Sequence, residues 1–186
     1  ARALAEDATA VGYGAQATAN DSSAFGKAAL ANKANAIALG SDAKAIGIAS
    51  QAFGREATAS GSNSIAIGSQ SNAIGNYSQA SGFIAKATGN ASLALGNASN
   101  ALGDSATALG DHAIATKTNS LAIGTGARSD FANATAIGSG AVALQKSGST
   151  ATSSLTLGSQ GSGTTDYFLP GLDNKPSSGT EYLVID

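Results

Sequence analysis

Glycine returns at every fourteenth position between residues 12 and 138, without a gap. A half-period of seven residues runs through the same stretch: every seventh residue from Ala10 to Ala143 is alanine, except Ser129, and every seventh residue from Ala8 to Ala141 is alanine or serine. A fixed period of this kind indicates one small structural unit that is stacked many times. We therefore expect a regular repeat structure without a conventional globular core.

A seven-residue period is also typical of coiled coils, so a helical interpretation has to be compared with a β one. Written in lines of seven from Ser64, the chain reads SIAIGSQ, SNAIGNY and SQASGFI. Small residues stand at i, i+2 and i+4 of each line, which is the two-residue period of a strand. Glycine in the interior of a helix would cost about 1 kcal/mol at each occurrence. The pattern favours strands.

Seven residues suffice for a strand of about five residues and a tight turn of two. Two such lines close one coil of fourteen residues, which is short for a triangular β-helix. We predict an all-β parallel β-roll, a solenoid of flattened coils stacked about 4.8 Å apart, in which about ten coils give a rod of roughly 48 Å. The expected turn pairs are residues 69–70, 76–77, 97–98, 104–105 and 111–112.

Alternate residues of each strand should point into the lumen between the two strands of a coil. In so flat a coil only alanine, serine or glycine fits there. The apolar fraction of 42% is accordingly made up largely of alanine, with 24 glycines in the chain. The predicted lumen residues of one coil are Ser64, Ala66 and Gly68 on one strand and Ser71, Ala73 and Gly75 on the other.

One strand of each coil carries a large apolar residue at one outward position, in a series that runs from Val11 to Ile137 with Ser81 as the lone polar exception. Four more apolar residues stand two positions earlier, at Ile37, Ile65, Leu93 and Leu121. Soluble monomers rarely expose so long an apolar stripe. We therefore predict that sister copies cover it in a closed ring, and the pattern leaves open whether two or three chains take part. The predicted interface residues are Val11, Phe25, Ile37, Leu39, Phe53, Ile65, Ile67, Leu93, Leu95, Leu109, Leu121, Ile123 and Ile137.

The other strand of each coil has a mixed outward surface. Lys44, Lys86 and Arg128 share one phase at intervals of three coils, about 14 Å. They form a possible ligand-contact surface for an extended molecule such as a collagen triple helix. The alternative, which we favour, is that these charges keep an exposed sheet from pairing with another sheet. Apolar residues are interspersed among them, and we favour contact between chains for these over the alternative of apolar patches for a partner molecule: Leu30, Ile46, Ile74, Leu102 and Ile114.

Little in the chain could carry catalysis or bind a metal. There is no cysteine, and the one histidine, His112, stands beside Asp111 in a predicted turn. The serines have no positioned base, and no carboxylates are paired on one face. The 10 basic and 12 acidic residues are too few and too balanced for nucleic-acid binding. We predict no enzymatic activity, no cofactor, no metal and no small-molecule substrate.

Four segments resemble the NSVAIGxxS repeat of YadA-type heads in the trimeric autotransporter adhesins of Gram-negative bacteria. They are NSIAIGSQS (63–71), NSLAIGTGA (119–127), ANAIALGSDA (34–43) and ASLALGNAS (91–99). The resemblance covers residues 8 to about 144. It implies a left-handed parallel β-roll, assembled as a homotrimer and displayed on the cell surface outside the outer membrane. It also implies binding to extracellular matrix proteins such as collagen, fibronectin or laminin, or to cells.

Residues 145–186 depart from the repeat, so we divide the chain into a head of residues 1–144 and an irregular last coil with a cap or connector. Residues 154–158 resemble one more coil, with Thr156 in place of a lumen alanine. Residues 167–169 and 182–185 are expected to form one or two closing strands. No apolar run is long enough to span a membrane, and the start of the chain lacks a signal peptide. An export signal and an anchor are therefore expected outside this sequence.

The sequence thus predicts a non-enzymatic adhesin head that attaches to host matrix, cells or surfaces. The alternative function is a structural spacer in a fibre, such as a phage tail or an adhesin stalk, with no binding role of its own.

Overall fold

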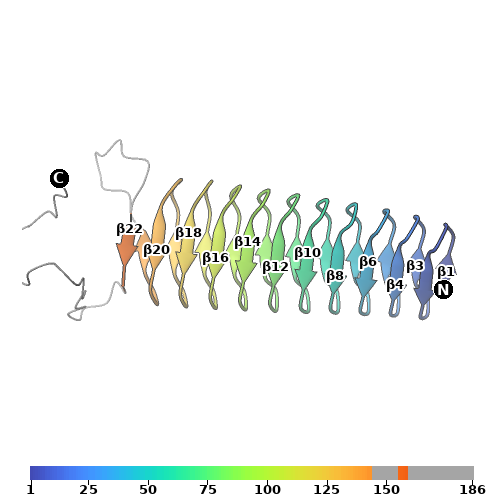
Figure 1. Cartoon of the computed structure of the whole chain (residues 1–186). Helices are drawn as coiled ribbons and strands as arrows, with labels where there is room; N and C mark the ends of the chain where they lie inside the picture. Colours follow the sequence, from blue (N-terminus) through green and yellow to red (C-terminus); the bar gives the residue numbers. More distant parts are fainter. Residues whose placement is uncertain (144–154, 159–186) are drawn as a thin grey trace, which may run out of the picture.

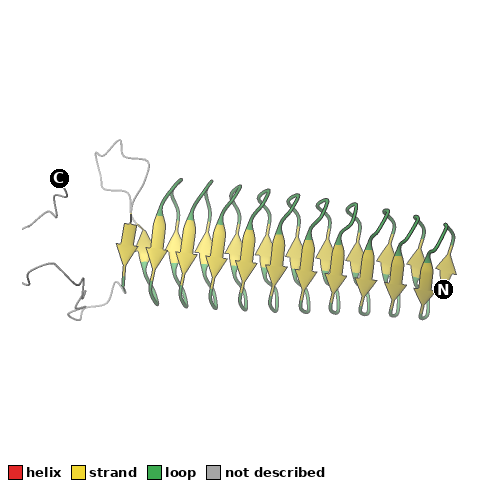
Figure 2. Ribbon diagram, in the orientation of Figure 1, coloured by secondary structure: helices red, strands yellow, loops and turns green. Residues whose placement is uncertain are grey.

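The computed structural model describes residues 1–143 and 155–158, which form one elongated stack of coils (Figure 1). Each coil contributes one short strand to each of two parallel sheets that face each other across a narrow lumen. Figure 2 shows that this part of the chain consists of strands and connecting loops. The all-β parallel solenoid predicted from the sequence is confirmed.

Sheet A contains the odd-numbered strands, each two residues long, and its strand order follows the chain. The strands are β1 (Arg2–Ala3), β3 (Gln16–Ala17), β5 (Leu30–Ala31), β7 (Lys44–Ala45), β9 (Thr58–Ala59), β11 (Asn72–Ala73), β13 (Lys86–Ala87), β15 (Asn100–Ala101), β17 (Ile114–Ala115), β19 (Arg128–Ser129) and β21 (Val142–Ala143).

Sheet B contains the even-numbered strands, each three residues long. The strands are β2 (Thr9–Val11), β4 (Ser23–Phe25), β6 (Ile37–Leu39), β8 (Gln51–Phe53), β10 (Ile65–Ile67), β12 (Gln79–Ser81), β14 (Leu93–Leu95), β16 (Thr107–Leu109), β18 (Leu121–Ile123), β20 (Thr135–Ile137) and β22 (Leu155–Leu157).

Every strand pairs in parallel with the strand of the next coil, and between consecutive coils of residues 1–143 the register is fourteen residues. Ala66 pairs with Ala52 on one side and with Ala80 on the other, and Ala73 pairs with Ala59 and Ala87. Equivalent residues therefore lie in columns along the rod, about 4.8 Å apart. Any property that recurs every fourteen residues in the sequence becomes a line on the surface or in the core.

The strands are shorter than the five residues predicted, because the turns take more of each coil. Each turn is closed by a backbone hydrogen bond, such as the Ser71 N–H to the Gly68 carbonyl at 3.3 Å. The same turn stacks on the turn of the preceding coil, because the Gln70 N–H donates to the Arg55 carbonyl at 2.8 Å. Hydrogen bonding between coils thus continues through the turns. The five predicted turn pairs all lie at turn tips, as expected.

We call the turns that follow sheet-B strands the lower edge, whose tips run from residues 13–14 to 139–140 at the bottom of Figure 1. The turns that follow sheet-A strands form the upper edge, with tips from residues 6–7 to 132–133. The second tip residue has a positive φ throughout both edges, with values near 55° where it is not glycine. This left-handed conformation suits glycine, asparagine and aspartate best.

The core consists of alanine and serine, as predicted. The central alanine of every three-residue strand from β4 to β20 and the second residue of every two-residue strand from β3 to β21 have no exposed surface, for example Ala66 and Ala73. Serines occupy further lumen positions, and several donate from Oγ to the carbonyl three residues earlier, as Ser92 does to Gly89 at 2.6 Å. The lumen has no room for larger side chains, so the large aliphatic and aromatic side chains of residues 1–143 point outward.

The glycines that recur every fourteen residues are required by close contact between neighbouring coils. From the sequence we had attributed them to the narrow lumen, which admits only small side chains. Gly68 has a φ of +116°, and a Cβ atom on it would lie 2.5 Å from the carbonyl oxygen of Gly82. Gly75 has an ordinary φ, but a Cβ atom on it would lie even closer to a carbonyl oxygen, that of Gly89. Backbone therefore packs directly on backbone at both edges.

The stack continues beyond residue 143. β22 pairs with β20 through a register of twenty residues, with Ala136 opposite Thr156, and the Gly158 N–H donates to the Ile137 carbonyl at 2.7 Å. The additional coil predicted at residues 154–158 is thus present in sheet B. The closing strands expected at 167–169 and 182–185 lie outside the described residues.

Candidate interaction surfaces

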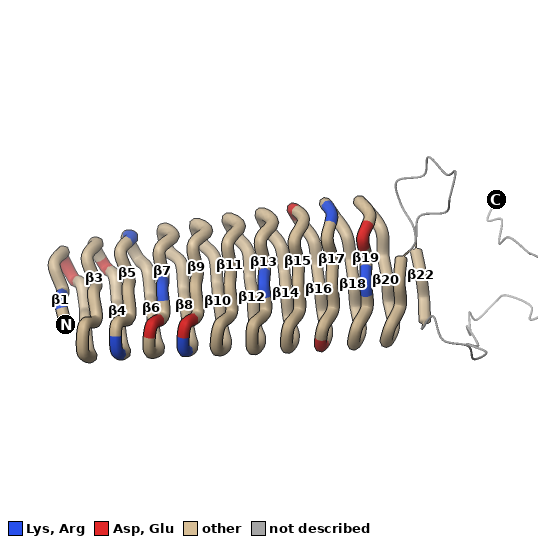
Figure 3. The backbone as a smooth tube through the Cα atoms, turned by 180° about the vertical axis from the view of Figure 1, so that it is seen from behind, with Lys and Arg blue, Asp and Glu red and all other residues tan. Residues whose placement is uncertain are grey.

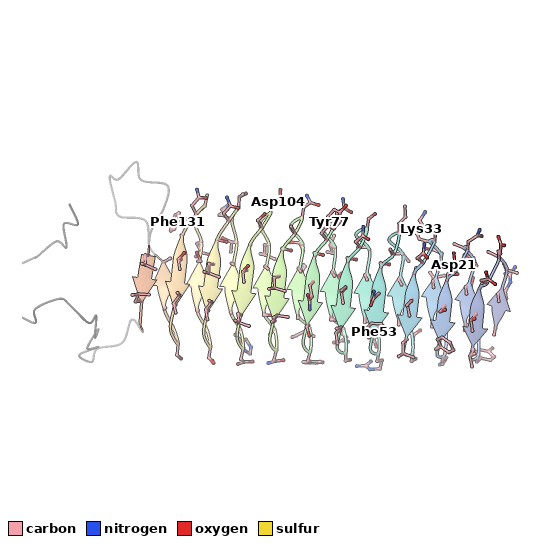
Figure 4. The ribbon with its side chains drawn as sticks, in the orientation of Figure 1. Asp21, Lys33, Phe53, Tyr77, Asp104 and Phe131 are labelled. Carbon is pink, nitrogen blue, oxygen red and sulfur yellow. The ribbon has the colours of Figure 1, made fainter. Side chains whose placement is uncertain are left out.

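The thirteen residues predicted as an interface all lie on the outward side of sheet B. Strand register arranges them in two columns, which hold the first and third residues of each strand. Ile65 and Ile67 show the arrangement, with buried Ala66 between them. Figure 4 shows Phe53 on this face of the rod. We call the thirteen residues the sheet-B ridge.

The ridge is only partly shielded within one chain. In the third-position column, the most exposed residues are Val11, Leu39, Ile67 and Leu109. Leu39, for example, is 50% exposed. Ile37, Ile65 and Leu121, in the first-position column, are half-buried by their neighbours on adjacent strands. One chain therefore leaves a long apolar surface in water, which favours its burial by another molecule.

Polar residues interrupt the first-position column in six strands, with Thr9 in β2, Ser23 in β4, Gln51 in β8, Gln79 in β12, Thr107 in β16 and Thr135 in β20. Among the described strands of sheet B, only β12 is also polar at its third position, where it carries Ser81. The backbone continues through β12 without a change of register. At this level of the rod, within residues 1–143, sheet B offers no large apolar side chain to a partner.

Lys44, Lys86 and Arg128 lie in one outward column of sheet A, exposed and three strands apart (Figure 3). The structure adds Arg2, which occupies the same column in β1 because Arg2 pairs with Gln16. Arg2 was not predicted as part of this row, although it precedes Lys44 by the same 42 residues as separate the others. Within the described residues Arg128 forms an ion pair with Asp130, whereas Lys44 and Lys86 form none.

The apolar residues of sheet A are fewer and more scattered than those of the ridge. Ile74 and Leu102 are exposed in the column that follows the strands, and Ile46 there is half-buried. Leu30 and Ile114 are half-buried between polar neighbours in the same column as Lys44. Sheet A is therefore a mixed face, as predicted, and it lacks a continuous apolar line.

Amide and carboxylate side chains connect the coils along the upper edge. The Ser62 N–H donates to Asn76 Oδ1 at 2.9 Å, the Asn76 N–H to Asn90 Oδ1 at 3.1 Å, and the Asn90 N–H to Asp104 Oδ1 at 2.7 Å. Each side chain thus accepts a hydrogen bond from the backbone of the preceding coil. We call these four residues the asparagine ladder.

His112 and Asp111 form an exposed pair on the lower edge, with 2.8 Å between Nδ1 and Oδ2. The amide of Asn97, which donates to Asp111 Oδ1 at 2.7 Å, lowers the pKa of Asp111 together with the weaker effect of His112. Among the residues that the structure describes, no three His, Cys, Asp or Glu side chains gather as metal ligands.

The described residues also contain no helix with the length and hydropathy of a membrane span.

Comparison with protein families gives matches that repeat along the rod. The family described as "YadA head domain repeat (2 copies)" matches residues 3–29, 17–43, 45–71, 87–113 and 115–143. A search of curated proteins gave no match. The longest unmatched interval inside the head, residues 72–86, contains β12 with its polar outward residues. The family is one of structural adhesin domains and not of enzymes. Because the matched segments cover more than half of the chain, this protein belongs to the YadA head family.

Proposed function

We propose that this chain is the head of a surface-displayed trimeric adhesin. Three copies, wound as left-handed rolls, pack around a common axis through the sheet-B ridge, outside the outer membrane of a Gram-negative bacterium. Their outer surface attaches the cell to host extracellular matrix, to other cells or to surfaces. The observation that carries the proposal is the exposed ridge in a chain of the YadA head family.

The need for sister copies follows from the dimensions of the coil. The lumen is filled by alanine and serine, so the chain cannot turn its large side chains inward without breaking both sheets. Fully covering a Leu or Ile side chain is worth about 1.5–3 kcal/mol. Half-buried residues such as Ile65 gain less, because neighbouring strands already cover them. The exposed members of the ridge therefore provide most of the free energy of assembly.

Binding of a ligand would be spread over the outer surface. The cation row on sheet A, Lys44, Lys86 and Arg128, repeats about every 14 Å. This spacing exceeds the Debye length of about 8 Å at physiological salt, so each cation acts on a ligand separately. Weak equivalent contacts gain strength when three chains and many fibres engage together. An extended ligand such as a collagen-like protein, fibronectin or laminin suits this arrangement.

The direct experiment measures binding of the purified, assembled chain to surfaces coated with collagen, fibronectin or laminin, and to cultured cells. We expect saturable binding to at least one of them and none to albumin. Absence of binding to every surface, by a chain shown to be trimeric, would contradict the adhesive role while leaving the assembly intact.

A matched pair of variants tests the cation row. Lys44→Gln, Lys86→Gln and Arg128→Gln together remove three charges from sheet A, and we expect weaker binding with a smaller dependence on salt. The control removes the same number of charges from the two edges, through Lys27→Gln, Lys33→Gln and Lys117→Gln. Equal loss in both variants would show that overall charge, and not the row, sets the affinity.

The uniform register of the coils from β1 to β21 favours a second candidate, a spacer that only extends a fibre. Deletion of residues 1–144 from the full-length protein separates the two functions. Loss of attachment supports the adhesin head, whereas shorter fibres that still attach support the spacer.

A further inference from the structure

One coil carries large apolar side chains at its edges in place of sheet B. In the turn after β12, Phe83 is 52% exposed and Ile84 is 43% exposed. On the opposite edge, in the turn that precedes β12, Tyr77 is 69% exposed. The same coil has Gln79 and Ser81 in the outward positions of sheet B. These three edge residues were not predicted as contacts from the sequence; the signal for them is a large aromatic or aliphatic residue at a turn tip.

No other described level of the rod has large apolar residues at the turn tips of both edges. The lower-edge tips on either side of Phe83 begin with Ser69 and Asn97. Tyr13 is an exposed aromatic residue on the lower edge, but the upper-edge tips nearest to it, residues 6–7 and 20–21, are acidic or amide side chains. Ile48, on the upper edge, has charged or polar lower-edge tips at residues 41–42 and 55–56.

Backbone conformation makes these residues costly where they stand. Ile84 has a φ of 51° and Tyr77 a φ of 58°, both in the left-handed region. A β-branched residue rarely adopts that conformation, and asparagine or glycine would adopt it more easily. The Ile84 N–H donates to the Ser69 carbonyl of the preceding coil at 3.0 Å, so this turn has the same hydrogen bonding as the others in the stack.

A ring of parallel rods brings these two edges together. This step relies on the homotrimer proposed above. When flat rods face a common axis with sheet B, the lower edge of each copy meets the upper edge of the next, as in any cyclic head-to-tail interface. Rotation about an axis parallel to the rod leaves height unchanged, so edge contacts join residues at the same level. Tyr77 and Phe83 stand in the consecutive turns before and after β12, so they differ in height by about half a coil, roughly 2.4 Å, which large side chains can span.

We propose that Phe83 and Ile84 of each copy pack against Tyr77 of the neighbouring copy and form an edge contact that fixes the relative height of the three chains. The ridge could otherwise slide along itself, because its third-position column is apolar in every described strand except β12 and its first-position column alternates apolar and polar residues from β6 to β20. A shift of two coils would therefore largely restore the apolar contacts. The polar level at β12 adds a penalty for sliding, since Gln79 and Ser81 would then face apolar residues of the ridge.

The first test compares assembly of the whole chain with that of variants, by sedimentation across a concentration series. We expect Tyr77→Asn, and separately Phe83→Ser with Ile84→Asn, to raise the midpoint concentration of trimer formation about tenfold. Combining all three changes should add little, because the two sets contact each other. Tyr13→Ser is the control. Tyr13 lies on the lower edge, as Phe83 does, and is more exposed than Phe83 or Tyr77, so its removal should change the midpoint less than about twofold.

The second test measures proximity directly and does not depend on the stability of those variants. The chain has no cysteine, so the double substitution Tyr77→Cys with Phe83→Cys introduces the only two thiols. A short bifunctional maleimide should then give covalent trimers on a denaturing gel. The control pair, Asn35→Cys with Phe83→Cys, places the upper-edge thiol three coils away and should give none.

The outcomes separate this inference from the proposed assembly. If the unmodified chain is trimeric but both sets of variants assemble normally, or the two cysteine pairs cross-link equally, the edge contact is wrong and the trimer stands. If the unmodified chain is a monomer at every concentration, the assembly itself is wrong, and the edge contact falls with it.

Discussion

The backbone N–H of Asn76 donates to the side-chain Oδ1 of Asn90, fourteen residues later, at 3.1 Å. This bond belongs to the asparagine ladder, in which a side chain of one coil satisfies the backbone of the coil before it. The ladder runs where the upper-edge turns begin with glycine, from Gly61 to Gly103. These glycines allow the turns to approach closely, and the amides then connect them.

Replacing Asn90 with alanine removes the acceptor for the Asn76 N–H and the donor to Asp104. We expect a loss of about 1 kcal/mol in the free energy of unfolding, because the groups are exposed and water replaces part of each bond. Urea denaturation measures the change. Asn20→Ala is the control, since Asn20 occupies the same turn position outside the ladder; an equal loss there would contradict a specific role for the ladder.

Two glycine substitutions separate backbone strain from steric overlap. Gly89→Ala keeps an ordinary φ but places a methyl group into the Gly103 carbonyl, and we expect it to cost about 3 kcal/mol or more. Gly126→Ala has open space around its Cβ but a φ of +66°, so we expect about 1 kcal/mol. Thermal or urea unfolding of both variants gives the comparison. A larger cost at Gly126 would show that conformation outweighs packing between coils.

Lumen serines should differ according to their hydrogen bonds. Ser92 donates from Oγ to the Gly89 carbonyl at 2.6 Å, whereas Ser64, in the same column, has a buried Oγ without a partner. Ser92→Ala is expected to destabilise the chain by about 1 kcal/mol, and Ser64→Ala to be neutral or stabilising. The difference in unfolding free energy between the two alanine variants is the measurement. Equal losses would mean that both hydroxyls are bonded in solution.

Asp111 should titrate at a lower pH than an ordinary aspartate, because the Asn97 amide and then His112 stabilise its charged form. A carboxyl group whose pKa falls on folding stabilises the fold above its unfolded pKa, and that contribution is lost as the pH falls through its folded pKa. Asn97→Ala should raise the pKa of Asp111 toward its usual range in a carboxyl NMR titration. Asn119→Ala, which removes an amide from the upper edge, should leave the pKa unchanged.

A charge placed on the ridge should prevent assembly without unfolding the chain. Ile67 points outward from β10 and is exposed in a single chain, so Ile67→Lys leaves the lumen untouched. We expect the trimer to dissociate at micromolar concentration, since a buried unpaired charge is strongly unfavourable. Light scattering measures the mass, and Thr58→Lys on sheet A is the control. Normal trimers of Ile67→Lys would contradict an interface on sheet B.

Sequence periodicity determined most of the fold. Strand pairing in this chain joins residues fourteen apart, so a period of fourteen in the sequence specifies the register, and the two-residue alternation around Ala66 specifies which side chains fill the lumen. The ridge on sheet B, including Phe53 and Ile67, followed from the same alternation. These features could be predicted because they depend only on position within one repeat.

Stacking of the coils decided the rest. The sequence could not show that Gly68 is required by the carbonyl of Gly82, because that contact exists only when two coils lie at van der Waals distance. The seven-residue lines place Tyr77 and Phe83 in consecutive turns, but they could not show how much of each side chain stays exposed once the turns stack. Periodicity specifies which residues are equivalent; the distances between coils specify what each equivalent position contacts.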